Sequence, residues 1–306
     1  MRDVIIIGSG PAGYTAGIYT ARAGLKPLLI ASSVEAGGEL MKTTEVENYP
    51  GFPEGAMGPD LMANFQAQAE KFGTEILLDD VIEVDLKGDV KIVKTALGDT
   101  FEAKTVILAT GAAYRELGLP REKELSGRGV SWCATCDGFF FREKVIAVVG
   151  GGDSAMEEAN FLTRFGTKVY LIHRRDSFKA SKIMADRALN NPKIEVIYNS
   201  EVAEILGETN VTGIKLRNTQ DGSLSDLAID GLFIAIGNDP RVWLVEDQVE
   251  LTPEKFIQVE GRSSKTSIPG VFAAGDVIDP TYRQAITAAG SGCVAALDAE
   301  HYLNAH

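Results

Sequence analysis

One local pattern restricts the folds open to this chain of 306 residues: a short apolar strand that runs into a glycine-rich turn and then into a helix. Its first copy has a strand at Val4–Ile7, the turn Gly8–Gly13 and a helix over Tyr14–Ala23, and another strand follows at Pro27–Ile30. The first strand is short and apolar throughout, as in parallel sheets that are covered on both faces. This order of elements predicts the beginning of a βαβ unit.

The same pattern returns near the middle of the chain. A strand at Val145–Val149 leads into Gly150–Ala155, a helix over Met156–Phe165 and a further strand at Lys168–Ile172. Both copies end in an apolar strand that closes on a glycine, at Gly111 and Gly237. The sequence therefore predicts an α/β fold with two Rossmann-like, three-layer domains.

The order of the motifs predicts that one domain is inserted into the other. The last segment has a strand that begins at Val271 and a helix over Tyr282–Tyr302, and it is too short for a third domain. We expect it to complete the first module. Residues 1–113 and 243–306 would then form one discontinuous domain, and residues 114–242 the second.

Composition argues against several kinds of partner. The net charge of −13 disfavours nucleic acid and anionic membranes, since both bind basic surfaces. No apolar run approaches the roughly 20 residues of a membrane span, and the N-terminus lacks the layout of a signal peptide. We therefore expect a cytoplasmic protein. The three histidines, His173, His301 and His306, are spaced too widely for a zinc site, and no metal is predicted.

Both glycine turns suit the pyrophosphate of a dinucleotide, because a turn without side chains lets backbone amides and a helix N-terminus approach the phosphates. A NAD site usually has an acidic residue about 20 residues further on. The second copy instead has His173, Arg174 and Arg175 there, with Lys179 nearby. These cations suit the 2′-phosphate of NADP, the alternative being a solvated basic loop.

The first copy has Ala31-Ser32-Ser33 at the corresponding position and follows neither rule. Two nicotinamide sites in one small enzyme would be unusual. A flavin is the natural complement, because it accepts a hydride and passes electrons on.

Cys133 and Cys136 form a CxxC motif, which indicates a redox pair or half of a zinc site. Zinc would need two more ligands, and the remaining cysteine, Cys293, stands alone. Chance packing of two cysteines is the other alternative. A hydride-donor site and a flavin site in one chain favour the redox pair. Asp137 follows directly; burial would raise the pKa of its carboxyl and suit it to deliver a proton, unless it is a turn or capping residue.

Together these motifs resemble the low-molecular-weight thioredoxin reductases over essentially the whole chain. The matching segments are Gly8–Tyr14, Thr44–Phe52, Cys133–Gly138, Gly150–Ala155, His173–Asp176, Gly275–Val277 and Tyr282–Ala285. The resemblance implies bound FAD, NADPH as reductant, a homodimer and thioredoxin as the protein substrate. It also implies that Cys136 faces the flavin and that Cys133 attacks the substrate.

The resemblance assigns further residues to the cofactors, with Asp276 on the ribityl chain and the helix that starts near Ala285 at the pyrimidine end of the flavin. The positive end of that helix dipole favours the anionic reduced ring. The expected FAD residues are Gly8, Ser9, Gly10, Pro11, Ala12, Gly13, Ala31, Gly37, Gly38, Glu39, Leu40, Asn48, Gly111, Gly275, Asp276, Arg283, Gln284 and Ala285. The expected NADPH residues are Gly152, Asp153, Ser154, Ala155, His173, Arg174, Arg175, Lys179, Ile236 and Gly237.

Two residues depart from the family pattern. Many members have glutamine where this chain has Glu39, and a carboxylate near the flavin could lower its reduction potential or weaken FAD binding. Many also have arginine where Lys179 stands, which keeps the charge but loses a fork of donors.

A single dithiol must reach a buried flavin and later a bulky protein disulfide. We therefore expect the second module to swivel on the connections Ala112–Leu119 and Asn238–Trp243. Alternative functions are a thiol oxidase, a disulfide reductase fed by ferredoxin and a nucleotide-sensing binding protein; the basic cluster disfavours the first two.

Overall fold

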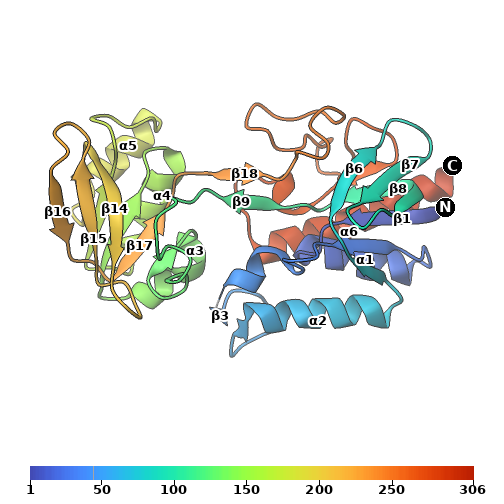
Figure 1. Ribbon diagram of the computed structural model, residues 1–306, viewed down its shortest axis with the longest axis horizontal. Coiled ribbons are helices and arrows are strands. Elements are labelled where there is room, and N and C mark those ends of the chain that lie inside the picture. The colour runs from blue at the N-terminus through green and yellow to red at the C-terminus, as the bar shows by residue number, and fades with distance from the viewer. Residues whose placement is uncertain (44) are drawn as a thin grey trace. The chain divides into compact units, whose positions relative to one another are not determined.

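The computed structural model describes residues 1–43 and 45–306, so Thr44 of the segment Thr44–Phe52 lies outside the described residues. The chain divides into two compact units (Figure 1). Unit 1 contains Met1–Ala113 and Asp239–His306, and unit 2 contains Tyr114–Asn238. The second break therefore falls after Asn238, whereas the order of the motifs predicts it after residue 242. At the two crossings, strands β9 (Ala112–Tyr114) and β18 (Asn238–Pro240) pair with each other.

Unit 1 is built on a seven-stranded sheet in the order β5-β2-β1-β8-β7-β6, with β19 also paired to β8. Strands β5, β2, β1, β8 and β19 run parallel, whereas β7 pairs antiparallel with β8 and β6 pairs antiparallel with β7. Because β8 is long, its first half pairs with β7 and its second half with β19. The C-terminal segment thus completes the first sheet. The strands are β1 (Arg2–Ile7), β2 (Leu28–Ala31), β5 (Glu75–Leu78), β6 (Val81–Asp85), β7 (Lys91–Thr95), β8 (Thr100–Leu108) and β19 (Val271–Ala273).

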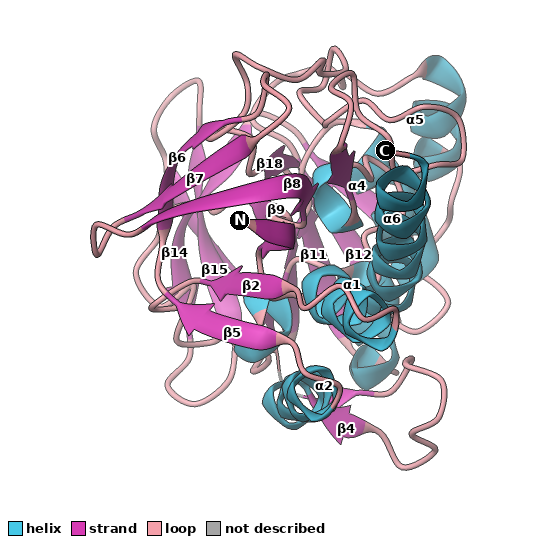
Figure 2. Cartoon of the chain, turned by 90° about the vertical axis from the view of Figure 1, so that its right-hand side faces the viewer, coloured by secondary structure: helices cyan, strands magenta, loops and turns pink. Residues whose placement is uncertain are grey.

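Strand β1 illustrates why unit 1 has three layers. Val4 and Ile6 belong to a core shared with the helices, whereas Ile5 and Ile7 belong to a second core shared with β6, β7 and the chain after residue 242. This alternation follows from the two-residue period of a strand. The helices are α1 (Pro11–Arg22), α2 (Gly58–Lys71) and α6 (Ala285–Ala305). Figure 2 shows α1 and α6 side by side, and they pack against each other. The short elements are η1 (Gly38–Lys42), β3 (Glu45–Val46), β4 (Ala56–Met57) and η3 (Gly275–Val277).

Unit 2 repeats these layers around a parallel five-stranded sheet in the order β10-β17-β11-β12-β13. In β11, Ile146 and Val148 pack with the helices, and Ala147 and Val149 pack toward the antiparallel sheet β14-β15-β16. The helices are α3 (Ala134–Asp137), η2 (Gly138–Phe141), α4 (Asp153–Leu162) and α5 (Lys182–Leu189). The strands are β10 (Val130–Ser131), β11 (Val145–Val149), β12 (Lys168–Ile172), β13 (Ile194–Ile197), β14 (Ser200–Leu206), β15 (Gly213–Asn218), β16 (Leu224–Leu227) and β17 (Gly231–Ile234).

The two helices that follow the glycine turns begin earlier than the sequence predicts. Helix α1 starts at Pro11 rather than Tyr14, and α4 starts at Asp153 rather than Met156. Proline is favourable in the first turn because it has no amide hydrogen to leave unpaired. The end of each turn therefore already belongs to the helix, and the free amides of the first helical turn lie at the glycines.

Candidate functional site

The first glycine turn combines close packing with one open position. Gly8 has a φ of 110°, which favours glycine, and a Cβ on it would overlap the carbonyl of Ala109. A Cβ on Gly13 would overlap the carbonyl of Gly8. At Gly10, by contrast, an added Cβ meets no atom within 4 Å. The amide end of α1 is thus open in front of Gly10, which is the cradle that a pyrophosphate requires.

Segments that are distant in sequence lie around this cradle. Ser9 Oγ accepts a hydrogen bond from the Gly37 amide at 2.9 Å. A Cβ on Gly38 would lie 3.3 Å from the Cα of Gly10. These contacts bring the expected flavin loop against the turn.

The C-terminal segment joins the same site. A Cβ on Gly275 would lie 2.9 Å from the Cβ of Ala12, so only a glycine fits closely against α1 there. The amide of Asn48 donates to Gln284 Oε1 at 3.3 Å. The structure thus gathers expected FAD residues from both parts of unit 1.

Asp276 is a partly buried acid in this group. Burial raises the pKa of its carboxyl to about 6; the charges of Asp279 and Glu39 add to the shift, and those of Arg283 and Arg241 oppose it. Arg283 has a φ of 48°, an uncommon conformation for a residue other than glycine. The Asp279 carboxylate holds this strained turn by accepting the Arg283 amide hydrogen at 2.9 Å.

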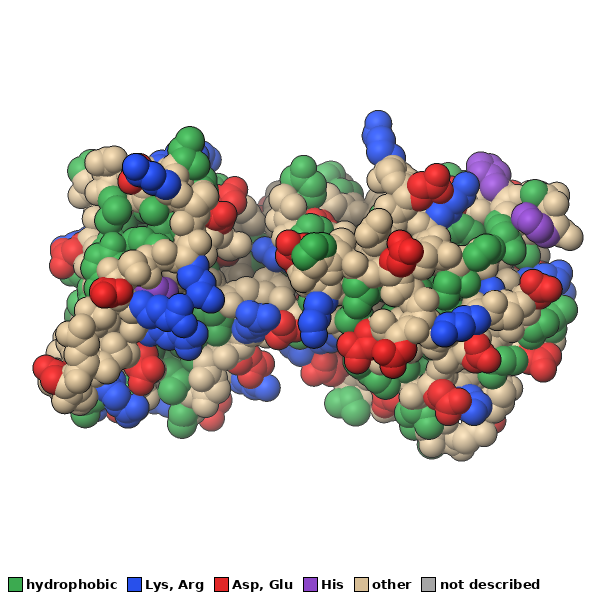
Figure 3. Space-filling view, turned by 90° about the horizontal axis from the view of Figure 1, so that it is seen from above, with side chains coloured by type: hydrophobic (Ala, Val, Ile, Leu, Met, Phe, Trp, Pro, Cys, Tyr) green, Lys and Arg blue, Asp and Glu red, His purple; other side chains and the backbone are tan. Residues whose placement is uncertain are grey.

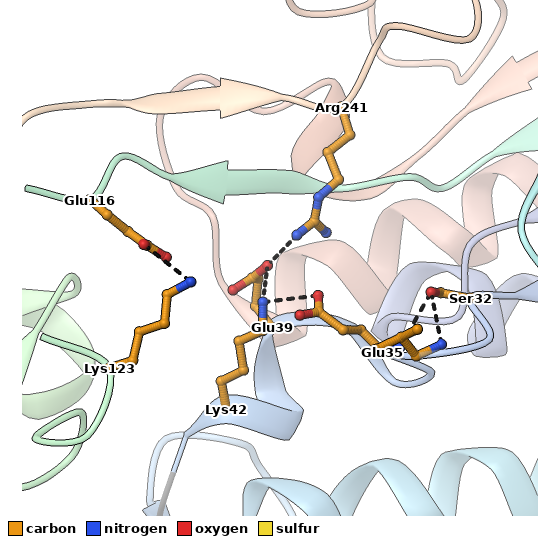
Figure 4. A network of polar contacts seen from close by, with 8 residues as sticks. Ser32, Glu35, Glu39, Lys42, Glu116, Lys123 and Arg241 are labelled. Atoms are coloured by element: carbon orange, nitrogen blue, oxygen red, sulfur yellow. Dashed lines mark hydrogen bonds and ion pairs between the residues drawn. The ribbon is translucent and has the colours of Figure 1, made fainter. Parts of the chain in front are cut away.

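Glu39 is balanced by two cations rather than left as an isolated charge. Its Oε1 accepts a hydrogen bond from Arg241 Nη2 at 2.6 Å and lies 3.6 Å from Lys42 Nζ (Figure 4). The backbone of Arg241 is fixed as well, because its amide donates to Gly111 O at 2.9 Å and its carbonyl accepts Thr110 Oγ1 at 2.8 Å. Arg241 lies 202 residues from Glu39, and no local pattern pointed to it.

The second glycine turn likewise has closely packed glycines and one glycine that is open to the solvent side of the turn. A Cβ on Gly150 would overlap the carbonyl of Ala235, and one on Gly151 would overlap the ring of His173. At Gly152 an added Cβ meets no atom within 4 Å. Because α4 begins at Asp153, its amide end is open in front of Gly152.

The basic cluster beside this turn separates into one buried and three exposed residues. His173 is 8% exposed, its Nε2 lies 3.0 Å from Ser177 O, and burial lowers the pKa of its imidazole. His173 therefore supports the turn from beneath as a neutral ring. Arg174, Arg175 and Lys179 are exposed, and none of them forms an ion pair within residues 1–43 and 45–306. Figure 3 shows Lys and Arg side chains gathered next to the histidine on the left of the view.

Cys133 and Cys136 form a disulfide with Cα atoms 5.3 Å apart, at the start of α3. The hydroxyl of Ser131 connects this disulfide to an acid, because it accepts the Cys133 amide hydrogen at 3.1 Å and donates to Asp137 Oδ2 at 2.6 Å. Burial raises the pKa of the Asp137 carboxyl, and the hydrogen bond from Ser131 partly opposes that shift. The arrangement can therefore hold a proton on an acid that is connected through Ser131 to the backbone of Cys133.

The dithiol and the second turn belong to one unit, since Ala134 of α3 shares a core with Ala155 and Met156 of α4. Cys293 lies on α6 of unit 1, beside Tyr19 of α1. Among the described residues, no cluster of His, Cys, Asp and Glu could hold a metal ion. The helices of the same residues are too short or too polar to cross a membrane.

Comparisons with known proteins agree with this geometry. The family model described as pyridine nucleotide-disulphide oxidoreductase matches residues 2–292. A thioredoxin reductase of Streptomyces coelicolor is 60% identical over 305 residues, which cover 100% of this chain and 95% of that protein. A bifunctional thioredoxin reductase/thioredoxin of Mycobacterium leprae is 57% identical, over 100% of this chain and 67% of that protein.

Two solved structures are 42% identical to this chain and superpose to different extents. The thioredoxin reductase from Giardia duodenalis has a TM-score of 0.94, with 99% of each chain covered. The Lactococcus lactis thioredoxin reductase, described as the FR conformation, has a TM-score of 0.65 with 100% of each chain covered. By its sequence motifs, its two layered units and these similarities, the chain belongs to the pyridine nucleotide-disulphide oxidoreductases and, among them, to the thioredoxin reductases.

Proposed function

We propose that this chain reduces the disulfide of a thioredoxin with electrons that pass from NADPH through FAD to Cys133 and Cys136. The observation that carries the proposal is the disulfide next to the partly buried acid Asp137, with Ser131 hydrogen-bonded to both the Cys133 amide and the Asp137 carboxylate. FAD and NADPH are the cofactors of this family. When bound, FAD accepts the hydride of NADPH and passes its two electrons to a disulfide.

The residues of each unit fit these cofactors. In unit 1, the open cradle at Gly10 would hold the FAD pyrophosphate, and Asp276 would contact the ribityl chain. In unit 2, the open cradle at Gly152 would hold the NADPH pyrophosphate, and the three exposed cations would face its 2′-phosphate. We therefore assign unit 1 to FAD and unit 2 to NADPH.

The roles of the dithiol and its acid follow from the balance of the reaction. Reduction of the Cys133–Cys136 disulfide takes two electrons and two protons, and the Asp137 carboxyl is placed to supply a proton. The Cys133 thiolate attacks the substrate disulfide, forms a mixed disulfide and releases one substrate sulfur as a thiolate. Cys136 then attacks the sulfur of Cys133, which releases the second substrate sulfur and restores the internal disulfide.

One dithiol serves both the flavin and an external protein, so we propose that the units move relative to each other on β9 and β18. The two solved relatives described above must differ from each other in arrangement, because the same chain superposes on them with TM-scores of 0.94 and 0.65 at equal identity. Covalent cross-linking of the two units is expected to stop turnover while FAD stays bound. Full activity of a cross-linked form would refute the movement.

A homodimer in the cytoplasm is also part of the proposal. One face of α6 exposes Ile286, Val294 and Leu297, which are 44%, 37% and 42% exposed, and Tyr19 of the neighbouring α1 is 42% exposed. Such a strip suits a second copy of the chain better than water. Analytical ultracentrifugation of the holoenzyme tests this: a dimer is expected, and Val294→Glu should weaken it. A monomer at micromolar concentration would refute the homodimer.

Turnover of the purified flavoprotein with NADPH or NADH, and thioredoxin as acceptor, tests the whole function. We expect rapid, NADPH-selective reduction over many turnovers. A strong NADH preference would refute the interpretation of Arg174, Arg175 and Lys179. Failure of both nucleotides to reduce the flavin would instead favour a thiol oxidase or a ferredoxin-fed reductase.

A further inference from the structure

The segment that carries the three cations is tied down along its backbone. At its start, the carbonyl of Arg174 accepts Thr219 Oγ1 at 3.1 Å, and the carbonyl of Arg175 accepts the Asn199 amide at 3.1 Å. At its end, the amides of Lys179 and Ala180 both donate to Gly151 O, at 2.8 and 3.1 Å. The backbone is therefore fixed while the cationic side chains remain exposed.

The last tie of this segment is made by a side chain of the glycine turn. Asp153 Oδ1 accepts the Ser181 amide hydrogen at 2.7 Å and the Ser181 hydroxyl at 3.0 Å. Asp153 begins α4, and Ser181 is the N-cap of α5. The carboxylate thus connects the N-terminus of α4 to that of α5, although the two residues are 28 positions apart in the sequence.

Ser181 does not use its hydroxyl as a serine N-cap usually does. A capping serine accepts a hydrogen bond from an amide of the first helical turn. Here the side chain makes no such bond to α5, and its hydroxyl donates to Asp153 instead. The hydroxyl therefore does not cap α5 and instead makes a contact that holds Lys179–Ser181 against the second glycine turn.

We propose that Asp153 is a positioning residue for coenzyme selectivity, not a cofactor ligand. Its carboxylate fixes Ser181 and thereby holds the neighbouring Lys179 in the segment that would receive a 2′-phosphate, whose other end, at Arg174 and Arg175, is tied by Thr219 and Asn199. The proposal rests on the assignment of unit 2 to NADPH. It gives a reason for an acidic residue beside a pyrophosphate cradle, where its charge alone would be unfavourable.

Three roles of Asp153 make different predictions. A positioning role predicts that Asp153→Ala weakens nucleotides with a 2′-phosphate and spares those without it. A ligand role predicts that both kinds weaken together. A purely repulsive charge predicts the opposite sign, because removal of a negative charge would tighten the binding of phosphates.

The experiment measures binding of 2′,5′-ADP and ADP to the oxidised holoenzyme by calorimetry. For Asp153→Ala we expect the affinity for 2′,5′-ADP to fall about tenfold and that for ADP to change less than about twofold. Asp153→Asn keeps an acceptor oxygen and should stay close to the wild type. Asp186→Ala, an exposed acid on α5, is the matched control and should have no effect.

Two further results decide the mechanism. Ser181→Ala should lose part of the 2′,5′-ADP affinity in the wild-type background and none in the Asp153→Ala background, because the two residues act through one contact. An equal loss for both probes, tighter binding, or no change in Asp153→Ala would each overturn the proposal. Failure of the wild type to turn over NADPH would count against the function of the enzyme, while the binding comparison still tests Asp153.

Discussion

The raised pKa of the partly buried Asp276 predicts that the protein without FAD becomes less stable as the pH rises. The pKa of this carboxyl is 3.8 in the absence of other interactions and about 6 in the fold. The folded state therefore holds the proton more tightly than the unfolded state. Stability from this group is present below about pH 4, is lost as the pH rises through about 6, and does not change further above that.

The magnitude follows from the two pKa values. The difference between 3.8 and about 6 corresponds to about 3 kcal/mol of destabilisation at pH 7 and above. About half of this cost is already present at pH 5, so the step between pH 5 and pH 8 is about 1.5 kcal/mol. Asp276→Asn removes the charge and keeps the shape, and it should be more stable than the wild type by these amounts.

Urea unfolding of the FAD-free protein at pH 5 and pH 8 measures this effect, with Glu246→Gln as a control at an exposed acid of unit 1. The free energy of unfolding of Asp276→Asn minus that of the wild type should grow between the two pH values, whereas the control should show no such change. In the presence of FAD the order should reverse, because the variant lacks the carboxylate that we propose to contact the ribityl chain. A stability difference that is constant between pH 5 and pH 8 would refute the reasoning.

Three further predictions concern the two sites. Cys133→Ser should still allow NADPH to reduce the flavin in stopped-flow absorbance but should abolish thioredoxin reduction; normal thioredoxin turnover would exclude its role. Asp137→Asn should slow turnover at least about a hundredfold, with the rate of flavin reduction by NADPH unchanged, because a positioned acid contributes on that order; a variant as fast as the wild type would assign the proton to another group. Gly10→Ala should fold normally, since its added Cβ meets no protein atom within 4 Å, yet bind FAD more weakly than the wild type; an unchanged affinity for FAD would place the pyrophosphate elsewhere.

The features that sequence reasoning predicts well are those whose cause is local. The strand, turn and helix around Gly8 and Gly13 depend on contacts between neighbours, so the glycine spacing already contains them. The insertion of one domain into another follows from motif order, and β19 pairs with β8 as that order requires. The predicted starts of α1 and α4 are three residues late, because the last residues of each glycine turn are themselves helical.

The features that sequence reasoning missed depend on contacts between distant segments. Arg241 became a partner of Glu39 only once the fold brought the end of β18 to the flavin loop. Ser131 lies six residues from Asp137, but nothing in its type marks it as the donor that holds the acid. His173 stands in a run with Arg174 and Arg175 and is grouped with them by sequence, yet its ring is buried against Gly151.

An acidic chain that binds two phosphate-rich cofactors must compensate its carboxylates one by one. The net charge of −13 opposes anionic ligands at long range, so binding depends on what each nearby carboxylate touches. Glu39 is paired with Arg241 and Lys42, and Asp153 is occupied by Ser181. Asp276 is near the positive charges of Arg283 and Arg241, which oppose the rise of its pKa, and it takes up a proton only below about pH 6. The sign of a residue beside a glycine turn therefore does not decide whether it repels a phosphate; its partner does, and the partner comes from a distant part of the chain.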